Sequence, residues 1–193
     1  TKPFKEIGLD AKLNKKSDKR RLVILVVGET ARADHMSING YDLKTNPNLE
    51  QEEIISFDKM TSCGTDTALS VPCMFSLLDR SSYNHAKGKN MSNVLDIISH
   101  AGVSVLWLDN NSSSKSVADR ITFKDYRSSD QNSICNPECR DEGMLVNLQN
   151  YIDEQDNRDL LIVLHSMGSH GPAYYKRYPK GFEVFLPACQ TNQ

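Results

Sequence analysis

Three short apolar runs, each followed at once by polar side chains, constrain the fold of this chain more than any other feature of its sequence. The runs lie in "RLVILVVGE" (residues 21–29), "VSVLWLDNN" (103–111) and "DLLIVLHSMGSHG" (159–171). Continuous β-branched and leucine-rich runs of this length are typical of strands that are buried on both faces. We therefore expect three buried strands.

Helical patterns separate these runs. "SNVLDIISHAG" (92–102) has apolar residues at helical spacing, with Ser92 as the expected N-cap and Gly102 just past the end. "ECRDEGMLVNLQNYIDEQD" (138–156) has the same spacing despite an internal glycine, whereas residues 109–134 are expected to form a long polar loop. The alternation predicts one α/β domain in which helices cover both faces of a mainly parallel sheet.

Composition restricts the classes of function. Hydrophobic residues make up 38% and charged residues 25% of the chain, and no run approaches the roughly 18 apolar residues of a membrane-spanning helix. The net charge of −2 gives no general electrostatic support for binding nucleic acid. We expect residues 1–20 to form a basic, solvated linker, with contact to a membrane surface as the alternative. The basic residues around this segment are Lys2, Lys5, Lys12, Lys15, Lys16, Lys19, Arg20 and Arg21.

The cysteine spacing indicates disulfides. Cys63 and Cys73 flank nine residues, Cys135 and Cys139 flank three, and the paired spacings of a zinc finger are missing. We expect one disulfide within each pair and hence an oxidising compartment such as the periplasm, with reduced cytosolic thiols as the alternative. Cys189 is left over, and its partner is expected beyond Gln193.

Polar groups follow each expected strand. Glu29 comes after the first run, Asp109 and Asn111 after the second, and His165 closes the third with His170 a few residues on. In parallel sheets, ligands bind beyond the carboxyl ends of the strands. These positions are therefore where chemistry is expected, although a carboxylate after a strand can also serve only as a cap.

A second informative stretch is "TSCGTDTALSVPCMFSLL" (61–78), which predicts a rigid turn that delivers Thr65 or Thr67 to a helix N-terminus. The alternative is that Thr65, Asp66 or Thr67 simply caps that helix. A threonine nucleophile needs activation, because its hydroxyl is protonated at neutral pH. Zinc lowers the pKa of bound water from about 15.7 to about 7, which corresponds to a stabilisation of the deprotonated oxygen on the order of 12 kcal/mol, whereas a helix dipole supplies at most about 2 kcal/mol.

A metal would thus have to activate the threonine. Glu29 is the expected first ligand, with the threonine oxygen as the second. The remaining ligands are sought among Asp34, His35, His165, His170 and residues after Gln193.

Five stretches together resemble one family. They are "VVGETARADHMSINGY" (26–41), "TSCGTDTALSVPCMFS" (61–76), "NVLDIISHAGVSVLWLDNNSSSK" (93–115), "CRDEGMLV" (139–146) and "LHSMGSHGPAYYKRYP" (164–179). In this order and spacing they resemble the catalytic domain of the lipid A phosphoethanolamine transferases, which include the mobile colistin-resistance enzymes, within the alkaline phosphatase superfamily.

The resemblance implies a fold and a setting. The fold would be alkaline phosphatase-like, with a mainly parallel sheet sandwiched by helices, and incomplete at the C-terminus. Residues 1–20 would be a linker after an absent membrane domain, and 21–193 the N-terminal portion of a catalytic domain. That domain would lie at the periplasmic face of the Gram-negative inner membrane and act as a monomer.

The resemblance also implies roles for individual residues. Thr67 matches the nucleophile and a zinc ligand, and Glu29 matches a zinc ligand. The residues that match substrate-binding positions are Thr65, Asn111, Ser112, Lys115 and His170. The three disulfides of related enzymes agree with the two expected here and with a missing partner for Cys189.

One departure limits this transfer. The family completes its zinc site with an Asp-His pair in a later "DHG" motif, and Asp34–His35 lies too early to take that role. His35, His85 and His100 are expected to be structural or surface residues, and His165 a packed or hydrogen-bonded core residue. The further zinc ligands, for one or two ions, are expected beyond Gln193, so we expect this chain alone to be inactive.

The implied activity is transfer of phosphoethanolamine from phosphatidylethanolamine to a lipid A phosphate through a covalent intermediate on Thr67, giving polymyxin resistance. The first alternative is a phosphoethanolamine or phosphoglycerol transferase or phosphodiesterase of the same fold with a glycan or protein acceptor. Sulfatase chemistry is disfavoured, because "SVPCMFS" lacks the C-x-P-x-R arrangement. A cysteine hydrolase using Cys63 and a non-catalytic binding module are the remaining alternatives.

Overall fold

A four-stranded parallel sheet forms the centre of the molecule. The computed structural model describes residues 3–15 and 18–191, and Lys2, Lys16 and Gln193, on which expectations were placed, lie outside them. The strands are β1 (Leu22–Val27), β2 (Ser104–Asp109), β3 (Thr122–Asp125) and β4 (Leu160–His165), in the spatial order β1-β4-β2-β3. All three pairings are parallel, which confirms the expected sheet type.

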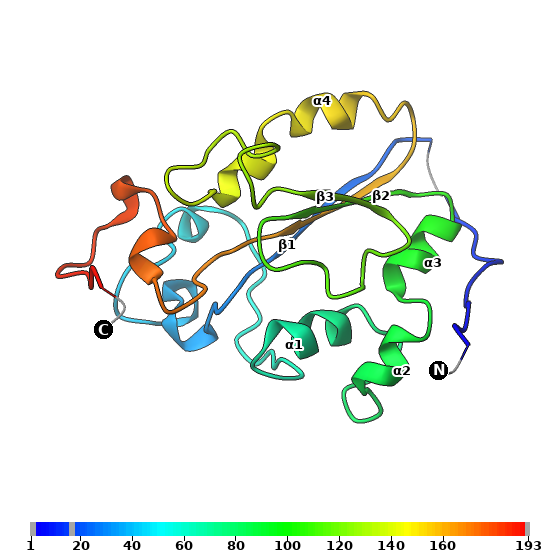
Figure 1. The fold of residues 1–193 in the computed structure, drawn as a ribbon, viewed down its shortest axis with the longest axis horizontal. Helices are drawn as coiled ribbons and strands as arrows, with labels where there is room; N and C mark the ends of the chain where they lie inside the picture. Colours follow the sequence, from blue (N-terminus) through cyan, green and yellow to red (C-terminus); the bar gives the residue numbers. More distant parts are fainter. Residues whose placement is uncertain (1–2, 16–17, 192–193) are drawn as a thin grey trace.

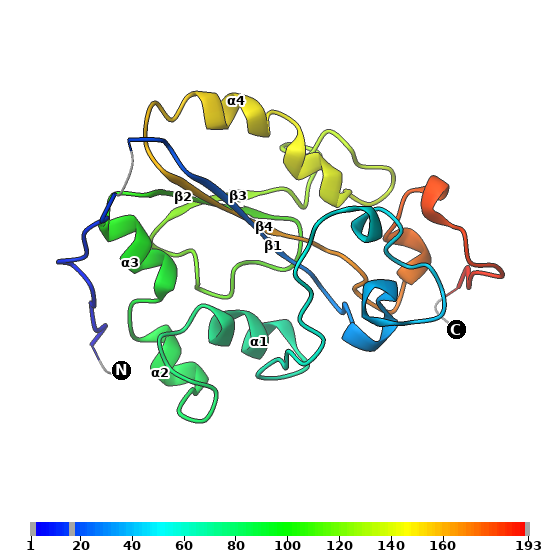
Figure 2. The same cartoon turned by 180° about the vertical axis from the view of Figure 1, so that it is seen from behind.

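Helices cover both faces of the sheet, as predicted. Helices α1 (Thr67–Met74), α2 (His85–Lys89) and α3 (Val94–His100) lie on one side, and α4 (Leu148–Asp153) lies on the other (Figures 1 and 2). Two apolar clusters result, one containing Trp107 and Leu95 and the other Ile162 and Leu148. The short 3-10 helices span Ala33–His35, Ser37–Asn39, Leu49–Gln51, Asp141–Leu145, Tyr174–Lys176 and Lys180–Phe182.

The expectation that all three apolar runs are buried is wrong for β1. Residues 22–26 are 38–63% exposed, and only Val27 of this strand is buried, whereas every residue of β4 is buried. β4 lies between β1 and β2, while β1 forms an edge of the described sheet. A continuous apolar run therefore identifies a strand but not its place in the sheet.

The start of α3 also differs from the expectation. Asn93, not Ser92, is the N-cap: its side chain accepts hydrogen bonds from the backbone of Leu95 and Asp96 at 2.8 and 3.3 Å. The Asp96 carboxylate in turn accepts from the Asn93 backbone N–H at 2.7 Å, which completes a capping box. Ser92 is buried and accepts from the Ile7 N–H instead.

Two further expectations are corrected. The stretch 109–134 is not all loop, because Thr122–Asp125 pairs with β2 as the edge strand β3. Its residues are largely exposed and polar, so they carry no pattern of burial. The helix expected over 138–156 is broken into a 3-10 helix and α4 at Asn147, whose φ of 65° is left-handed.

Part of the basic N-terminal segment contacts the domain instead of being wholly solvated. Lys5 forms a parallel bridge with Met91, and Lys15 and Arg21 pair with the carboxylate of Asp159 at 3.4 and 2.7 Å. Within the described ranges no helix has the length and apolar character that a membrane span requires.

Candidate active site

Thr67 is the first residue of α1, and its hydroxyl is not the helix cap. The side chain of Asp66 accepts the hydrogen bond from the Leu69 N–H at 2.9 Å and serves as the N-cap. The Cys63–Cys73 disulfide ties the preceding turn to the end of the same helix. Of the three capping residues considered, the structure thus selects Asp66, which leaves the Thr67 hydroxyl for another partner.

That partner is Glu29, which follows the end of β1. The Thr67 hydroxyl donates to Glu29 Oε2 at 2.8 Å, and the Asn111 side-chain amide donates to the same oxygen at 3.2 Å. Thr30 donates to Glu29 Oε1 at 2.9 Å. The carboxylate is therefore fixed by side chains from α1, from the loop after β2 and from its own loop.

These contacts decide the charge of Glu29. Partial burial by itself raises the pKa of its carboxyl, but hydrogen bonds from Thr30, Thr67 and Asn111 and the nearby charge of His170 together lower the pKa by more than burial raises it. The net pKa lies below the ordinary value for glutamate. Glu29 is thus a carboxylate at neutral pH, suited to hold a cation and poorly suited to take the proton of a hydroxyl.

The loop after β4 packs against the backbone of Glu29. The Ser169 N–H donates to the Glu29 carbonyl at 3.2 Å, and Gly168 has a φ of +49°. A Cβ atom at Gly168 would lie 3.0 Å from both the N and the O of Glu29, so a residue other than glycine would be strained at this position. His170 follows in this loop, with Nδ1 2.7 Å from the Gly171 carbonyl.

An open cleft of about 540 Å³ lies over the pair. Its lining includes both threonines of the predicted site, Thr65 and Thr67, together with Glu29. Apolar side chains of Val71 and Met74 line it as well. The structure therefore brings three of the predicted residues to one accessible place, and Asn111 joins them through its hydrogen bond to Glu29.

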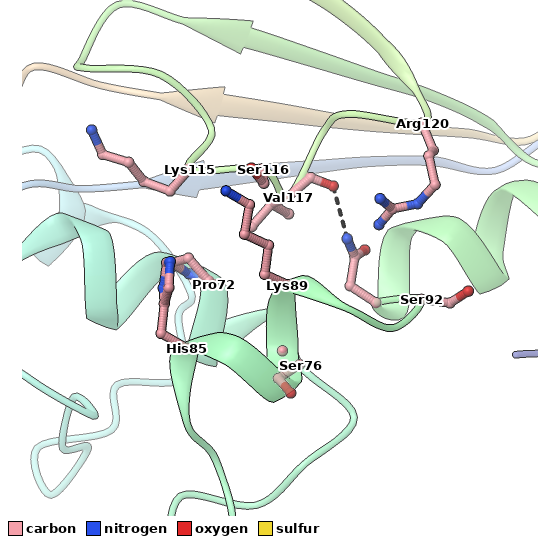
Figure 3. A pocket seen from close by; sticks show the side chains of 11 residues that line it. Pro72, Ser76, His85, Lys89, Ser92, Lys115, Ser116, Val117 and Arg120 are labelled. Carbon is pink, nitrogen blue, oxygen red and sulfur yellow. Dashed lines mark hydrogen bonds between the residues drawn. The ribbon is translucent and has the colours of Figure 1, made fainter. Parts of the chain in front are cut away.

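Ser112 and Lys115 lie differently. The Ser112 hydroxyl donates to the Asn111 side-chain oxygen at 2.7 Å, and Lys115 Nζ donates to the Ser112 carbonyl at 2.7 Å. Lys115 lines a separate pocket of about 20 Å³ with Lys89, and Arg120 stands at the opposite end of it (Figure 3). That volume holds about one water molecule. Contact of Lys115 with a substrate remains a prediction.

The described residues fit part of a zinc site and do not complete one. Glu29 and Thr67 supply two adjacent oxygen atoms, but no group of three His, Cys, Asp or Glu side chains in the described ranges could hold a metal ion. Asp34 pairs with Arg32 and His35 on the surface. These contacts fix the turn and leave the Asp34 oxygens engaged away from Glu29.

His165 is a hydrogen-bonded core residue, as expected. It is fully buried, and its Nδ1 lies 2.8 Å from Oδ2 of the buried Asp109, which also accepts from Trp107 Nε1 at 2.9 Å. The other oxygen of Asp109 accepts the backbone N–H groups of Asn111 and Ser113 at 3.1 Å each. Asp109 therefore fixes the loop that carries Asn111.

Sequence reasoning missed two contributors. Thr30 bonds Glu29 directly, and Asp141 binds the loops after β2 and β4; neither residue was expected at the site from the sequence. A hydroxyl beside a strand-end glutamate was a usable signal for Thr30. For Asp141 the only signal was its place in the matched stretch "CRDEGMLV".

Both expected disulfides, Cys63–Cys73 and Cys135–Cys139, are formed, and Cys189 is exposed and free among the described residues. The oxidising compartment inferred from them remains a prediction. A partner for Cys189 beyond Gln193 lies outside the described residues.

The chain is similar in sequence to a known protein family and to several curated proteins. The family model described as Sulfatase matches residues 21–193. Phosphatidylethanolamine transferase Mcr-1 of Escherichia coli is 51% identical over 183 residues, which cover 91% of this chain and 34% of that protein. Phosphoethanolamine transferase EptA of Salmonella typhimurium is 44% identical over 195 residues, covering 99% of this chain and 36% of that protein. The chain thus spans about a third of the length of these curated relatives.

Solved structures share the fold. The soluble domain of lipooligosaccharide phosphoethanolamine transferase A from Neisseria meningitidis superposes with a TM-score of 0.93 at 39% identity, covering 99% of this chain and 58% of that one. The C-terminal periplasmic domain of phosphoethanolamine transferase EptC from Campylobacter jejuni gives a TM-score of 0.83 at 36% identity, covering 98% and 57%. The parallel sheet with helices on both faces is therefore that of this group of domains.

Proposed function

The chain belongs to the sulfatase family, and we propose that it carries part of the catalytic site of a lipid A phosphoethanolamine transferase. The observation that carries the proposal is the pairing of the Thr67 hydroxyl with the Glu29 carboxylate in an open cleft. The names of relatives at 51% and 44% identity support the same reaction class. The missing C-x-P-x-R arrangement speaks against sulfate ester cleavage despite the family's description.

Thr67 is the proposed nucleophile. Glu29 cannot activate it as a base alone, since its pKa lies below the ordinary value and a hydroxyl titrates far above neutral pH. A bound zinc ion would lower the pKa of the hydroxyl by acting as a Lewis acid. Glu29 and Thr67 would supply two ligands, and we expect the others outside the described residues.

The proposed reaction has two transfers. The Thr67 hydroxyl gives up its proton as its oxygen attacks the phosphorus of phosphatidylethanolamine, the bond from phosphorus to the diacylglycerol oxygen breaks, and that oxygen takes up a proton. Phosphoethanolamine remains on Thr67 until an oxygen of a lipid A phosphate attacks the same phosphorus; the bond from phosphorus to the Thr67 oxygen then breaks, and that oxygen takes up a proton. Thr65 and Asn111 would orient the headgroup, and His170 and Lys115 would offset charge on the phosphoryl oxygens.

The proposed setting is the periplasmic face of the Gram-negative inner membrane, where the enzyme would act as a monomer. Disulfides such as Cys63–Cys73 and Cys135–Cys139 persist in oxidising compartments, which supports this location. One similar solved structure is that of an integral membrane protein, and another is that of a periplasmic domain. Residues 1–20 would be the link to a membrane domain. The modified lipid A would be less anionic and bind polymyxins less well.

A second acceptor is favoured by one observation. A Kdo(2)-lipid A phosphoethanolamine 7''-transferase of Escherichia coli is 30% identical over 176 residues. Its name assigns the same donated group to another position of the glycolipid. The alternative is therefore a transferase of this fold with another glycan acceptor.

Substitution at the two cleft threonines tests the proposal. In the intact protein, Thr67→Ala should abolish transfer from phosphatidylethanolamine to lipid A, while Thr67→Ser keeps a hydroxyl and retains part of it. Thr65→Ala, the matched control two residues away, should weaken transfer without abolishing the covalent step. Product analysis by mass spectrometry measures this, and full transfer by Thr67→Ala would refute the proposed nucleophile.

A further inference from the structure

The carboxylate of Asp141 joins the loops that follow the two central strands. Its Oδ1 accepts the side-chain amide of Asn110 at 2.8 Å and the backbone N–H of Met167 at 2.7 Å. Its Oδ2 accepts the backbone N–H of Gly168 at 2.9 Å. Asn110 follows β2 and the other two residues follow β4, so a single side chain fixes both strand ends relative to each other.

The turn that presents Asp141 is itself held firmly. The Cys135–Cys139 disulfide closes it, and the Cys139 carbonyl accepts a second hydrogen bond from the Asn110 amide at 3.1 Å. The fully buried Asn132 donates to the Arg140 carbonyl at 2.9 Å. Asp141 therefore stands on a rigid support, as a positioning group requires.

Both loops that Asp141 holds also contact Glu29. From the β4 side, Gly168 packs against the Glu29 backbone and the Ser169 N–H donates to the Glu29 carbonyl at 3.2 Å. From the β2 side, the Asn111 amide bridges the Ser166 carbonyl at 2.9 Å and Glu29 Oε2 at 3.2 Å. Displacement of either loop would move the carboxylate that faces Thr67.

We propose that Asp141 is a positioning residue that sets the place of Glu29 opposite Thr67 by holding the loops after β2 and β4 together. The proposal rests on the proposed function of the Glu29–Thr67 pair. Asp141 does not touch the cleft, so its effect would reach the chemistry only through Gly168, Ser169 and Asn111. Errors of about 1 Å at a reacting group can cost roughly 100-fold in rate.

The experiment compares Asp141 with its neighbour. In the intact protein, Asp141→Ala should lower kcat for transfer from phosphatidylethanolamine roughly 100-fold with little change in KM. Asp141→Asn keeps one oxygen acceptor but faces Gly168 with a donor, and should give an intermediate loss. Glu142→Ala is the matched control, because this adjacent carboxylate is exposed, and it should keep the unsubstituted rate.

Amide hydrogen exchange supplies the second readout. Asp141→Asn should increase exchange at the Ser169 amide, which Asp141 does not contact, while amides within β4 keep their protection. Unchanged kcat, or unchanged Ser169 exchange, would overturn the inference, as would equal losses in Glu142→Ala. If the unsubstituted protein transfers nothing, the proposed function fails, and the catalytic role of Asp141 falls with it. If the unsubstituted protein transfers and Asp141→Ala transfers at the same rate, only the inference fails.

Discussion

Two carboxylates stand at the carboxyl ends of apolar strands of this sheet, Asp109 as the last residue of β2 and Glu29 just after β1, and their surroundings are opposite. Glu29 at the edge strand β1 lies in an open cleft and receives the Thr67 hydroxyl at 2.8 Å. Asp109 at the central strand β2 is fully buried and lies 2.8 Å from the ring of His165. The place of a strand in the sheet thus separates a carboxylate that can meet a ligand from one that holds the scaffold.

The electrostatics agree with this division. Burial raises the pKa of Asp109 strongly, but hydrogen bonds from His165 and Trp107 and the charge of His165 lower it below its ordinary value. All its acceptor capacity is used within the protein, on side chains and on the backbone of the Asn111 loop. Glu29, by contrast, receives its hydrogen bonds at the wall of a cleft. Asp109 is therefore committed to the fold, and Glu29 is available for chemistry.

Removal of Asp109 is the largest expected effect on stability. Asp109→Ala leaves the buried ring of His165 and two backbone N–H groups without their partner, and should lower the free energy of unfolding by about 3–5 kcal/mol. Denaturant unfolding measures the loss. The matched change Asp125→Ala removes an exposed carboxylate paired with Arg127, and should cost less than about 1 kcal/mol.

Acid titration sharpens the same prediction. Because the folded pKa of Asp109 is lowered, its contribution to stability is present above the ordinary pKa of aspartate and is lost as pH falls through the folded value. Asp109→Asn should remove that part of the acid dependence. An unchanged profile of unfolding free energy against pH would contradict the scaffold role.

A pair of substitutions compares how much stability one side chain contributes in the edge strand β1 and in the central strand β4. Ile24 and Ile162 are partners in the β1–β4 register, yet Ile24 is 46% exposed and Ile162 is 0% exposed. Ile162→Ala should cost about 2–5 kcal/mol through lost burial and a cavity. Ile24→Ala should cost no more than about 1 kcal/mol. Equal losses in denaturant unfolding would show that β1 is covered as fully as β4.

The sheet was predictable because its signal is local. The runs 22–27, 104–109 and 160–165 are apolar throughout, and that pattern is enough to identify parallel strands. The burial of β1 was mispredicted because exposure depends on strand order, which the run does not encode. β3 was missed because its exposed residues 122–125 carry no apolar pattern, and pairing with β2 decides their conformation.

The site was predictable where a residue follows a strand or opens a helix. Glu29 and Thr67 met that condition, and the structure brings them into contact. The roles of Asp141 and Thr30 could not be read in the same way, because they depend on loops that meet only in the folded chain. For Lys115 the structure shows only that its ammonium group bonds the Ser112 carbonyl, and its contact with a substrate stays a prediction.

The central claim is that Glu29 and Thr67 form the reacting pair, and peptide mass mapping of the intact protein after incubation with phosphatidylethanolamine tests it most directly. We predict that phosphoethanolamine is found on Thr67 in the unsubstituted protein and that this modification is lost in Glu29→Gln. The same substitution should change the unfolding free energy by less than about 1 kcal/mol, because the Glu29 side chain is only partly buried. Modification of another residue, or undiminished modification of Thr67 in Glu29→Gln, would contradict the account.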